Sequence, residues 1–461
     1  MGLMDPSRRA LDWKFDPLEA LARWPADRRV ALLHSGRFDE HWARWSILAE
    51  PAGCYQFDAI GYGQSQWRGG EALKPQGTWR HRPFADLRRV IHCDKTAAGL
   101  WIGYLSYDLR AWIEKSSPCV ADDRHWPIMQ WAWCPGYLLY DTAQKRWFAC
   151  GDYALDGEPD LHAAQPQQAD YAAGRPISVF TRDRYEAAVS KVLDYIAAGD
   201  VFQVNLAQRF TCGLSGDFPL AQRTLYRRLA AASPAWYGAY LELDARHIIA
   251  SVSPELFLSV DQDRQVITRP IKGTRPASVR ADELRNSAKD IAELNMIVDL
   301  MRNDLGRVCT YGTVSVPQPR VIESHPTIHH GVATITGQLH PRYDIIHLLR
   351  ATTPGGSVTG APKVRAMQII DELEPVRRGP YCGCIGYFTG DTACFSIAIR
   401  TMLLDAVERR VDYSVGGGIV ADSDPASEYQ ETLDKAVAMR TALSDSLPVE
   451  RDEAVRHRAL V

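Results

Sequence analysis

Two pairs of acidic residues are spaced so that each pair could share one face of a helix. Asp290 and Glu293 are three residues apart. Glu428 and Glu431 repeat this spacing further along the chain. Many such pairs are only solvated surface charges, but Glu293 precedes the apolar stretch LNMIVDL and Glu428 follows a glycine run. Carboxylates from two helices, with the remaining positions left to water and substrate, suit Mg²⁺.

Two glycine-containing segments could bind an anion through backbone amides. The first, GGSVTGAPK, begins at Gly355, but Ala361 and Pro362 separate its last glycine from the lysine that a phosphate-binding loop requires. A turn that presents amides and hydroxyls to a polar ligand is the alternative. The second segment, Gly416 to Gly418, ends a predicted strand and could hold a carboxylate, although triple glycine is often only a bulge or tight turn.

Three single residues have both a structural and a chemical interpretation. Arg400 closes the apolar strand CFSIAIR and could either reach solvent or clamp a carboxylate with two hydrogen bonds. His330 is the kind of isolated histidine that is more often structural than catalytic. Lys272 lies between Pro270 and Gly273, where a surface turn is the default and a nucleophile is possible if the amine is neutral.

The elements that would position these residues do not alternate regularly, which favours an α+β build over a doubly wound parallel sheet. Asp183 and Glu186 indicate a capping box at the start of the first long helix, which Gly199 ends. Helical periodicity predicts helices at 181–198, 282–301 and 424–443, and alternation predicts a strand at 201–210. Composition divides the chain into 1–154, a linker or long loop at 155–178, a main region at 179–445 and a charged tail at 446–461.

Composition argues against several classes of protein. The 461 residues include 53 Lys and Arg against 56 Asp and Glu, a net charge of −3, so no basic field attracts nucleic acid or an anionic membrane. The most apolar stretch, near 128–140, contains a Pro-Gly pair and is shorter than the roughly 20 residues of a membrane span. Charged residues precede any apolar run at the amino terminus, unlike a signal peptide. Ten cysteines without a repeating spacing predict reduced thiols and a cytoplasmic protein.

Taken together, the motifs resemble those of the chorismate-utilising enzymes, which include anthranilate, aminodeoxychorismate, isochorismate and salicylate synthases. The resemblance is strong from Phe180 to Leu443 and weaker before the linker, in IGYLSYDL. It is carried by GDVFQVNLAQRF, SVSPELFL, RPIKGTRP, AELNMIVDLMRNDLGRV, TTPGGSVTGAPKVRAM, GCIGYF, SIAIRT, GGGIVADSDPASEYQET and LDKA. It implies an anthranilate-synthase-like α+β fold of two packed antiparallel sheets with helices outside, and Mg²⁺-dependent chemistry on chorismate. It also implies that 1–154 is the amino-terminal region of the anthranilate synthase component I type and that 179–445 is the chorismate-binding catalytic region.

Two positions indicate the branch of the family. Gln203 stands where isochorismate and salicylate synthases place a water-activating lysine. Lys272 stands in PIKGT where anthranilate synthases usually carry alanine. The lysine version is similar to the large component of aminodeoxychorismate synthase, in the 4-aminobenzoate branch of folate synthesis. That resemblance implies that Lys272 attacks C2 of chorismate as the C4 hydroxyl leaves, that ammonia then adds at C4, and that a glutamine amidotransferase subunit supplies the ammonia.

The resemblance also implies roles for individual residues. Glu255 is the expected general acid, and Glu293 and Glu431 are the expected Mg²⁺ ligands, with Glu428 and Asp290 acting through water. The enolpyruvyl carboxylate is expected at Arg400, Tyr387 and the amides of Gly416, Gly417 and Gly418. Further active-site positions are expected at Ser357, His330, Lys435 and Thr274. Two departures stand out, since His330 is followed by GVA where LVS is common and Gly417 replaces a usual alanine.

Some members of the family hold tryptophan, as a feedback inhibitor or as a bound structural molecule. The matching stretches contain Ser35, Trp236 and Tyr237. His34 replaces an acidic residue and Trp236 replaces a proline, so packing between the two halves of the chain is the alternative. Two other functions stay open at this point, an anthranilate synthase large subunit and a catalytically silent tryptophan-binding regulator. The intact acids, Lys272 and Arg400 count against a silent subunit.

Overall fold

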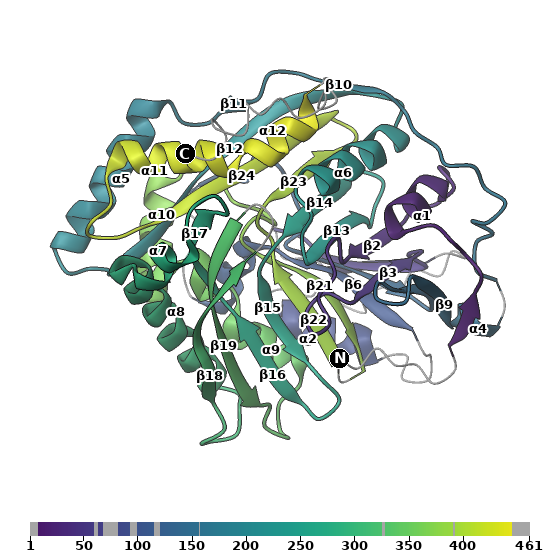
Figure 1. The fold of residues 1–461 in the computed structure, drawn as a ribbon, viewed down its shortest axis with the longest axis horizontal. Coiled ribbons are helices and arrows are strands. Elements are labelled where there is room, and N and C mark those ends of the chain that lie inside the picture. The colour runs from purple at the N-terminus through teal and green to yellow at the C-terminus, as the bar shows by residue number, and fades with distance from the viewer. Residues whose placement is uncertain are drawn as a thin grey trace.

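The computed structural model describes residues 8–59, 63–67, 82–92, 99–114, 120–155, 157–324, 328–390 and 392–444. Its strands form two large sheets, and every pairing between the described strands is antiparallel (Figure 1). In spatial order the first sheet contains β1 (Arg9–Leu11), β9 (Arg146–Gly151), β8 (Gly136–Asp141), β3 (Trp45–Ala49), β2 (Ala31–His34), β13 (Tyr237–Glu242), β14 (His247–Ser253), β23 (Thr401–Asp405), β24 (Arg410–Ile419), β12 (Gln203–Gly216) and β10 (Tyr171–Ala173), with β11 (Ile177–Ser178) and β20 (Gly360–Ala361) also paired to β12.

The second sheet crosses the middle of the molecule and extends into long hairpins at the lower edge of Figure 1. In spatial order it contains β17 (Ile271–Pro276), β19 (Ile328–Gln338), β16 (Gln265–Arg269), β15 (Leu256–Val260), β22 (Thr392–Ile397), β21 (Cys384–Thr389), β6 (Leu100–Leu105), β7 (Met129–Cys134), β4 (Gly53–Phe57) and β5 (Gly63–Trp67), with β18 (Ser315–Ser324) paired to β19.

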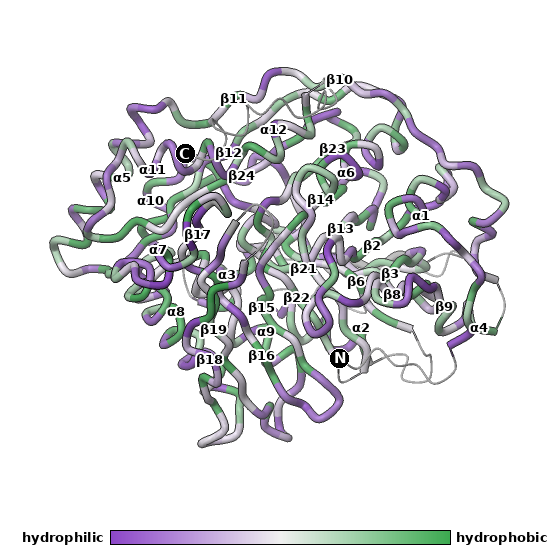
Figure 2. Tube along the Cα trace, in the orientation of Figure 1, coloured by the Kyte–Doolittle hydropathy of each residue, from purple (hydrophilic) through white to green (hydrophobic). Residues whose placement is uncertain are grey.

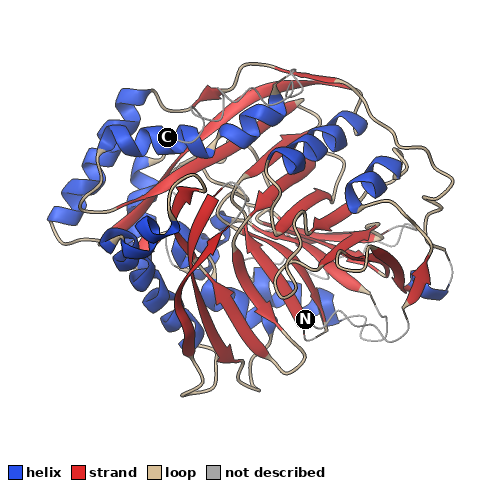
Figure 3. Ribbon diagram, viewed as in Figure 1, coloured by secondary structure: helices blue, strands red, loops and turns tan. Residues whose placement is uncertain are grey.

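The helices lie around the strands, gathered mainly along the upper and left edges of Figure 3. They are α1 (Pro17–Arg23), α2 (Pro83–His92), α3 (Arg110–Ile113), α4 (Asp152–Leu155), α5 (Arg182–Ala197), α6 (Leu220–Ala232), α7 (Ala281–Asn286), α8 (Ala288–Gly306), α9 (Ile345–Thr352), α10 (Lys363–Leu373), α11 (Pro425–Lys435) and α12 (Val437–Leu443). Two 3₁₀ turns span Tyr107–Leu109 and Gly356–Val358.

Three clusters of buried side chains define the layers. One cluster contains residues of both sheets, including Leu139 of β8 and Ile102 of β6, so the sheets face each other across it. A second packs the first sheet against α1, α6 and α12, and a third packs the second sheet against helices that include α8, α9 and α10. Hydrophobic residues accordingly concentrate on the inner strands, while many outer loops and helix faces are hydrophilic (Figure 2). The predicted α+β fold of two packed antiparallel sheets with helices outside is confirmed.

Both sheets are built from strands on either side of the 155–178 segment, because β2 pairs with β13 and β6 pairs with β21. The segment itself contributes the short strands β10 and β11 to the edge of β12. The division into regions stays a prediction, and the tail at 446–461 lies outside the described residues.

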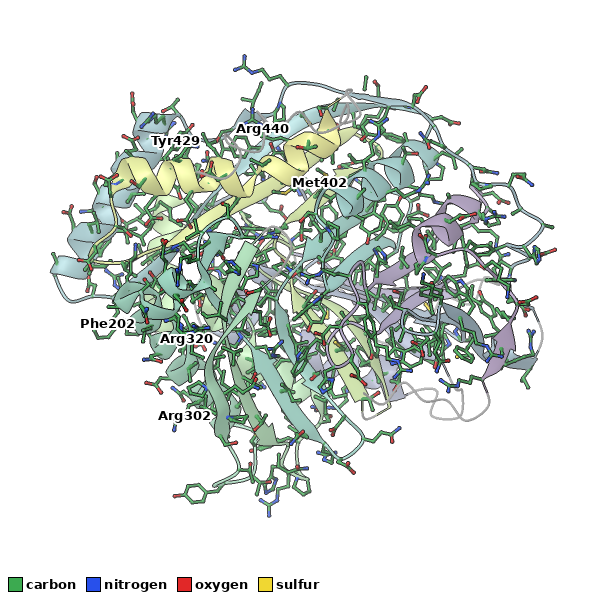
Figure 4. All side chains as sticks on the ribbon, viewed as in Figure 1. Phe202, Arg302, Arg320, Met402, Tyr429 and Arg440 are labelled. Atoms are coloured by element: carbon green, nitrogen blue, oxygen red, sulfur yellow. The ribbon has the colours of Figure 1, made fainter. Side chains whose placement is uncertain are left out.

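The three predicted helices all form, the first at its predicted bounds with another N-cap and the other two each divided into two helices. The first spans Arg182–Ala197, and its N-cap is Thr181, two residues before the predicted Asp183, because the Thr181 hydroxyl accepts the Arg184 N–H. The second is divided into α7 and α8 at Ser287, whose hydroxyl caps the new helix by accepting from Asp290 N–H. The third is divided into α11 and α12 at Ala436. Figure 4 labels Tyr429 on α11 and Arg440 on α12, with Met402 of β23 below them.

Candidate active site

The glycine run of β24 is held against β12. Gly416, Gly417 and Gly418 pair with Ala207, Leu206 and Asn205 in turn. A β-carbon on Gly418 would overlap the side-chain amide of Gln203 and lie 3.2 Å from the Lys272 Nζ atom. Glycine is therefore required here by the close approach of other groups.

Lys272 reaches this point from the opposite sheet. The pairing of β17 with β19 shifts register between Ile271 and Thr274, so that Lys272 and Gly273 form an irregularity at the strand start. Gly273 has a φ of +79°, and a β-carbon on Gly331 would lie 2.6 Å from the Lys272 carbonyl oxygen. Glycine at position 331, in the GVA that replaces the usual LVS after His330, thus leaves space for the Lys272 backbone beside β19. Burial lowers the pKa of the Lys272 amine, while the charge of Glu293 partly opposes this effect.

Glu255 lies between β14 and β15 and is only 5% exposed. The Ser357 hydroxyl donates to Glu255 Oε1 at 2.6 Å. Burial raises the pKa of Glu255 to about 7, and the Ser357 hydrogen bond and the Lys272 charge limit that increase. A carboxyl group with this pKa can hold a proton at neutral pH and release it to a leaving group.

His330 and Thr274 face each other across the β17–β19 pair. They are register partners, and Thr274 Oγ1 lies 2.9 Å from His330 Nδ1. His330 is buried in β19. The structure therefore brings two of the predicted site residues into direct contact, two positions beyond Lys272.

Helix α11 places two of the predicted metal ligands beside the glycine run. Glu428 Oε2 and Glu431 Oε1 would lie 3.0 Å and 3.3 Å from a β-carbon at Gly417. Ser423 donates to Glu428 Oε1 at 2.6 Å. Lys435 forms an ion pair with Glu431 Oε1 at 2.6 Å and donates to the Gly416 carbonyl at 2.8 Å. The Gly417 departure leaves both carboxylates more space than alanine would.

Helix α8 contributes a third acid to the same electrostatic environment. Burial raises the pKa of Glu293, and the negative charges of Asp290 and Glu431 act in the same direction while Lys272 opposes them. Asp290 has other partners, since its Oδ2 atom pairs with Arg275 at 2.8 Å. Its Oδ1 atom also lies 2.9 Å from where a β-carbon on Gly273 would be. Asp290 therefore supports the β17 irregularity that carries Lys272.

The donor chemistry beside Gly417 fits Mg²⁺. Within the ranges described, no three His, Cys, Asp or Glu side chains converge as a complete metal site. Mg²⁺, however, keeps several waters and is commonly held by one or two carboxylates together with substrate oxygens. Glu428 and Glu431 place carboxylate oxygens on one side of a backbone that has no side chain to fill the space.

Arg400 has an unusual backbone conformation and is partly buried without an acidic partner among the described residues. Its φ is +50°, which is uncommon for a residue with a side chain, and its carbonyl accepts the Val252 N–H of β14 at 3.1 Å. Burial lowers the pKa of its guanidinium. In the part of the chain that the structure describes, no carboxylate forms an ion pair with Arg400. A cation held in this way is suited to an anionic ligand.

Tyr387 lies away from this group. It pairs with Cys394 in the β21–β22 ladder, whereas Arg400 lies beyond Ile397, where β22 ends. It lines a separate cavity between the sheets. Tyr381, which the sequence analysis did not select, lies nearer, because the N–H of its neighbour Cys382 donates to the Ala398 carbonyl. Its only sequence signal was its place in the turn before GCIGYF.

The separate cavity measures about 60 Å³ and brings the three predicted tryptophan-site residues together. Ser35, Trp236 and Tyr237 line it along with Tyr387. Its described lining contains no Asp or Glu that could pair with an amino group, and burial lowers the pKa of His34 to about 4, which keeps the imidazole neutral. The cavity therefore suits an aromatic group better than an ammonium group.

The chain belongs to the chorismate binding enzyme family, whose sequence profile matches residues 50–441. Aminodeoxychorismate synthase component 1 of Escherichia coli K12 is 38% identical over 459 residues, which cover 94% of this chain and 98% of that protein. Anthranilate synthase component 1 of Saccharolobus solfataricus is also 38% identical, over 354 residues that cover 75% of this chain and 80% of the relative. The predicted membership of the family is confirmed.

Solved structures agree with this assignment. Anthranilate synthase component I of Streptococcus pneumoniae superposes with a TM-score of 0.72 at 28% identity, covering 94% of this chain and 98% of that one. The menaquinone-specific isochorismate synthase of Escherichia coli, at 17% identity, shares the fold with a TM-score of 0.70 and covers 95% of this chain and 94% of its own. None of the described helices is long and apolar enough to cross a membrane.

Proposed function

We propose that this protein is a chorismate-aminating enzyme of the aminodeoxychorismate synthase branch. It converts chorismate and ammonia into 4-amino-4-deoxychorismate and water, for 4-aminobenzoate and folate synthesis. The observation that carries the proposal is the Lys272 amine, which lies 3.2 Å from the β-carbon position of Gly418 with a pKa lowered by burial. The near full-length similarity to aminodeoxychorismate synthase component 1 supports the same branch.

The proposed reaction proceeds in two displacements. Lys272 Nζ forms a bond to C2 of chorismate as the ring double bonds shift and the C4 hydroxyl leaves. Glu255 donates its proton to that hydroxyl, which departs as water. Ammonia then adds at C4, the double bonds shift back, and the C2–Nζ bond breaks. The proton that Lys272 loses after bonding to C2 returns to it as the C2–Nζ bond breaks. One proton lost by the added ammonia restores the acid form of Glu255, so that the reaction balances.

The remaining site residues bind and orient the substrate in this scheme. Arg400 pairs with the enolpyruvyl carboxylate, and the amides of the glycine run donate to it. Ser357 holds the Glu255 carboxyl group in place. Glu293 and Glu431 would hold Mg²⁺, with Glu428 acting through water, and the bound ion would neutralise the ring carboxylate. Lys435 balances the charge of Glu431 until substrate and metal arrive.

Ammonia comes from outside this chain in the proposed reaction. The relatives are named as component 1 of their synthases, which supports a second component, and we expect a glutamine amidotransferase subunit. We place the complex in the cytoplasm, in keeping with the lack of any disulfide bond between the described cysteines.

Product analysis tests the proposal. The purified chain is incubated with chorismate, Mg²⁺ and either an ammonium salt or glutamine. We expect 4-amino-4-deoxychorismate with ammonium and no turnover with glutamine. Anthranilate and pyruvate would instead identify an anthranilate synthase, and unchanged chorismate under all conditions would favour a tryptophan-binding regulator. Glutamine-dependent turnover by the chain alone would contradict the proposed partner.

A further inference from the structure

A buried ion pair lies behind the candidate site without contacting any residue assigned to substrate. Arg378 donates from Nε and Nη2 to the two carboxylate oxygens of Glu374, at 2.9 Å and 2.6 Å. Their side chains are 3% and 6% exposed. Burying two charges is costly unless the remaining donors and acceptors are also satisfied. The other bonds of this pair therefore indicate its role.

Those bonds all reach backbone atoms of two segments that form the site. Arg378 Nη1 donates to the Val358 carbonyl at 2.9 Å, and Nη2 donates to the Asn205 carbonyl at 2.6 Å. Glu374 Oε1 accepts the Ala207 N–H at 2.8 Å. The planar Arg378 guanidinium, which we call the fork, thus joins β12 to the turn at Gly356–Val358.

Each joined segment holds a different part of the site. Val358 directly follows Ser357, whose hydroxyl donates to Glu255. Asn205 and Ala207 are the strand partners of Gly418 and Gly416. A displacement of the fork would move both the hydrogen-bond donor of the general acid and the strand behind the glycine run.

We propose that Arg378 and Glu374 are positioning residues, which hold Ser357 against Glu255 and hold β12 behind the glycine run. The inference rests on the proposed function for its catalytic consequence. Nearby catalytic geometry is sensitive to such support, because a misplacement of about 1 Å can reduce a rate by roughly 100-fold.

A second ion pair in the same chain provides a matched control. Arg223 and Glu242 also form two hydrogen bonds, both at 2.9 Å, and their side chains are likewise 3% and 6% exposed. Arg223 donates to backbone carbonyls too, at Trp24, Pro25 and Arg28. These partners lie in the amino-terminal part of the fold and in α6 and β13. Loss of this pair therefore costs stability without moving the site.

The test compares Arg378→Lys with Arg223→Lys. Both changes keep the charge and lose the planar fork, so we expect similar decreases in Tm. At a temperature where both variants are folded, Arg378→Lys should lower kcat for amination by about tenfold or more with a smaller change in the KM for chorismate. Arg223→Lys should leave both constants close to those of the wild type. Glu374→Gln, which preserves shape, should repeat the loss of kcat.

The pH profile separates positioning from a merely structural role. Among the described residues, the groups that act on Glu255 are the Ser357 hydroxyl, the Lys272 amine, the Ile271 backbone N–H and the Cys382 thiol. The Ser357 hydrogen bond favours the ionised carboxylate, so its loss in Ser357→Ala should move the basic limb of the kcat profile to higher pH. Arg378→Lys should move the limb in the same direction, and the double variant should move it no further than Ser357→Ala alone.

The inference is overturned if Arg378→Lys lowers Tm as Arg223→Lys does while kcat and the basic limb stay unchanged. It is equally overturned if the shifts of the two single variants add in the double variant. If the wild type does not aminate chorismate, the proposed function fails instead. The wild type, Ser357→Ala, Arg378→Lys and the double variant can then be compared by the pH dependence of their unfolding free energies, which reports the protonation of Glu255 without turnover.

Discussion

Lys272 Nζ and the backbone of Gly418 meet at the junction of the two sheets, with 3.2 Å between the amine and the β-carbon position of the glycine. Gly418 belongs to β24 in the first sheet and Lys272 to β17 in the second. The two residues are 146 positions apart in the chain. The position of the Lys272 amine therefore depends on packing between the two sheets. A substitution at Gly418 in β24 can change the surroundings of this amine.

Gly418→Ala should impair the reaction while the protein stays folded. The new β-carbon would overlap the Gln203 amide and press on the Lys272 amine, so we expect the rate of amination to fall by about tenfold or more. Gly306→Ala is the control, because a β-carbon there meets no atom within 4 Å. Steady-state kinetics and circular dichroism measure both effects. Equal activity of the two variants would disprove the close approach.

Lys272→Ala should bind chorismate and lose most amination, since no other amine would form the bond at C2. Lys272→Arg should not restore turnover, because a guanidinium stays protonated. Mass spectrometry of wild-type enzyme incubated with chorismate without ammonia should find a chorismate-derived adduct on the peptide that contains Lys272. Wild-type rates in Lys272→Ala would mean that ammonia attacks C4 directly.

As the pH rises, the free energy of unfolding of the wild type should decrease more than that of Glu255→Gln. The folded pKa of Glu255 is about 7, above its ordinary value of 4.5, so the folded protein retains a proton that the unfolded chain has lost. This favourable contribution is complete below pH 4.5 and is lost as the pH rises through 7. A shift of this size corresponds to about 3 kcal/mol. Urea unfolding of both proteins at pH 5 and pH 8 measures it, and parallel pH dependences would contradict the raised pKa.

Glu431→Gln should abolish turnover at matched Mg²⁺ concentration without unfolding the chain, because it removes charge from the proposed metal cradle. Asp434→Asn is the control on the same helix, where Asp434 is exposed and contacts Gln430. Activity titrated against Mg²⁺, and its loss on chelation, measure the effect. A Glu431→Gln variant that keeps wild-type turnover would remove this residue from the metal site.

Arg400→Gln should weaken chorismate binding and at the same time leave stability unchanged or higher. The guanidinium is partly buried without an acidic partner among the described residues, so its removal relieves a desolvation cost. We expect the KM for chorismate to rise by at least tenfold, about 1.4 kcal/mol of lost carboxylate binding. Thermal unfolding and kinetics together test this, and a large drop in Tm would show a structural role instead.

The residue types that form the candidate site could be predicted from the amino-acid sequence. Acids three residues apart, the glycine run and the lysine of PIKGT are local patterns, and their order along the chain was enough to predict the family. Helices were also predictable because apolar periodicity is local. The breaks at Ser287 and Ala436 were missed, since in each case the apolar periodicity continues across the end of one helix and the start of the next.

The sequence by itself determined the family, the fold class and which side chains could take part in the chemistry. Only the tertiary structure decided which of them meet. It placed Tyr387 on the inter-sheet cavity rather than beside Arg400, brought Lys272 against Gly418, and set the Arg378–Glu374 pair behind Ser357. The physical reason is that such contacts depend on strand register and on the packing of one sheet against the other. Both are set by many weak contacts between residues far apart in the chain, which no local pattern records.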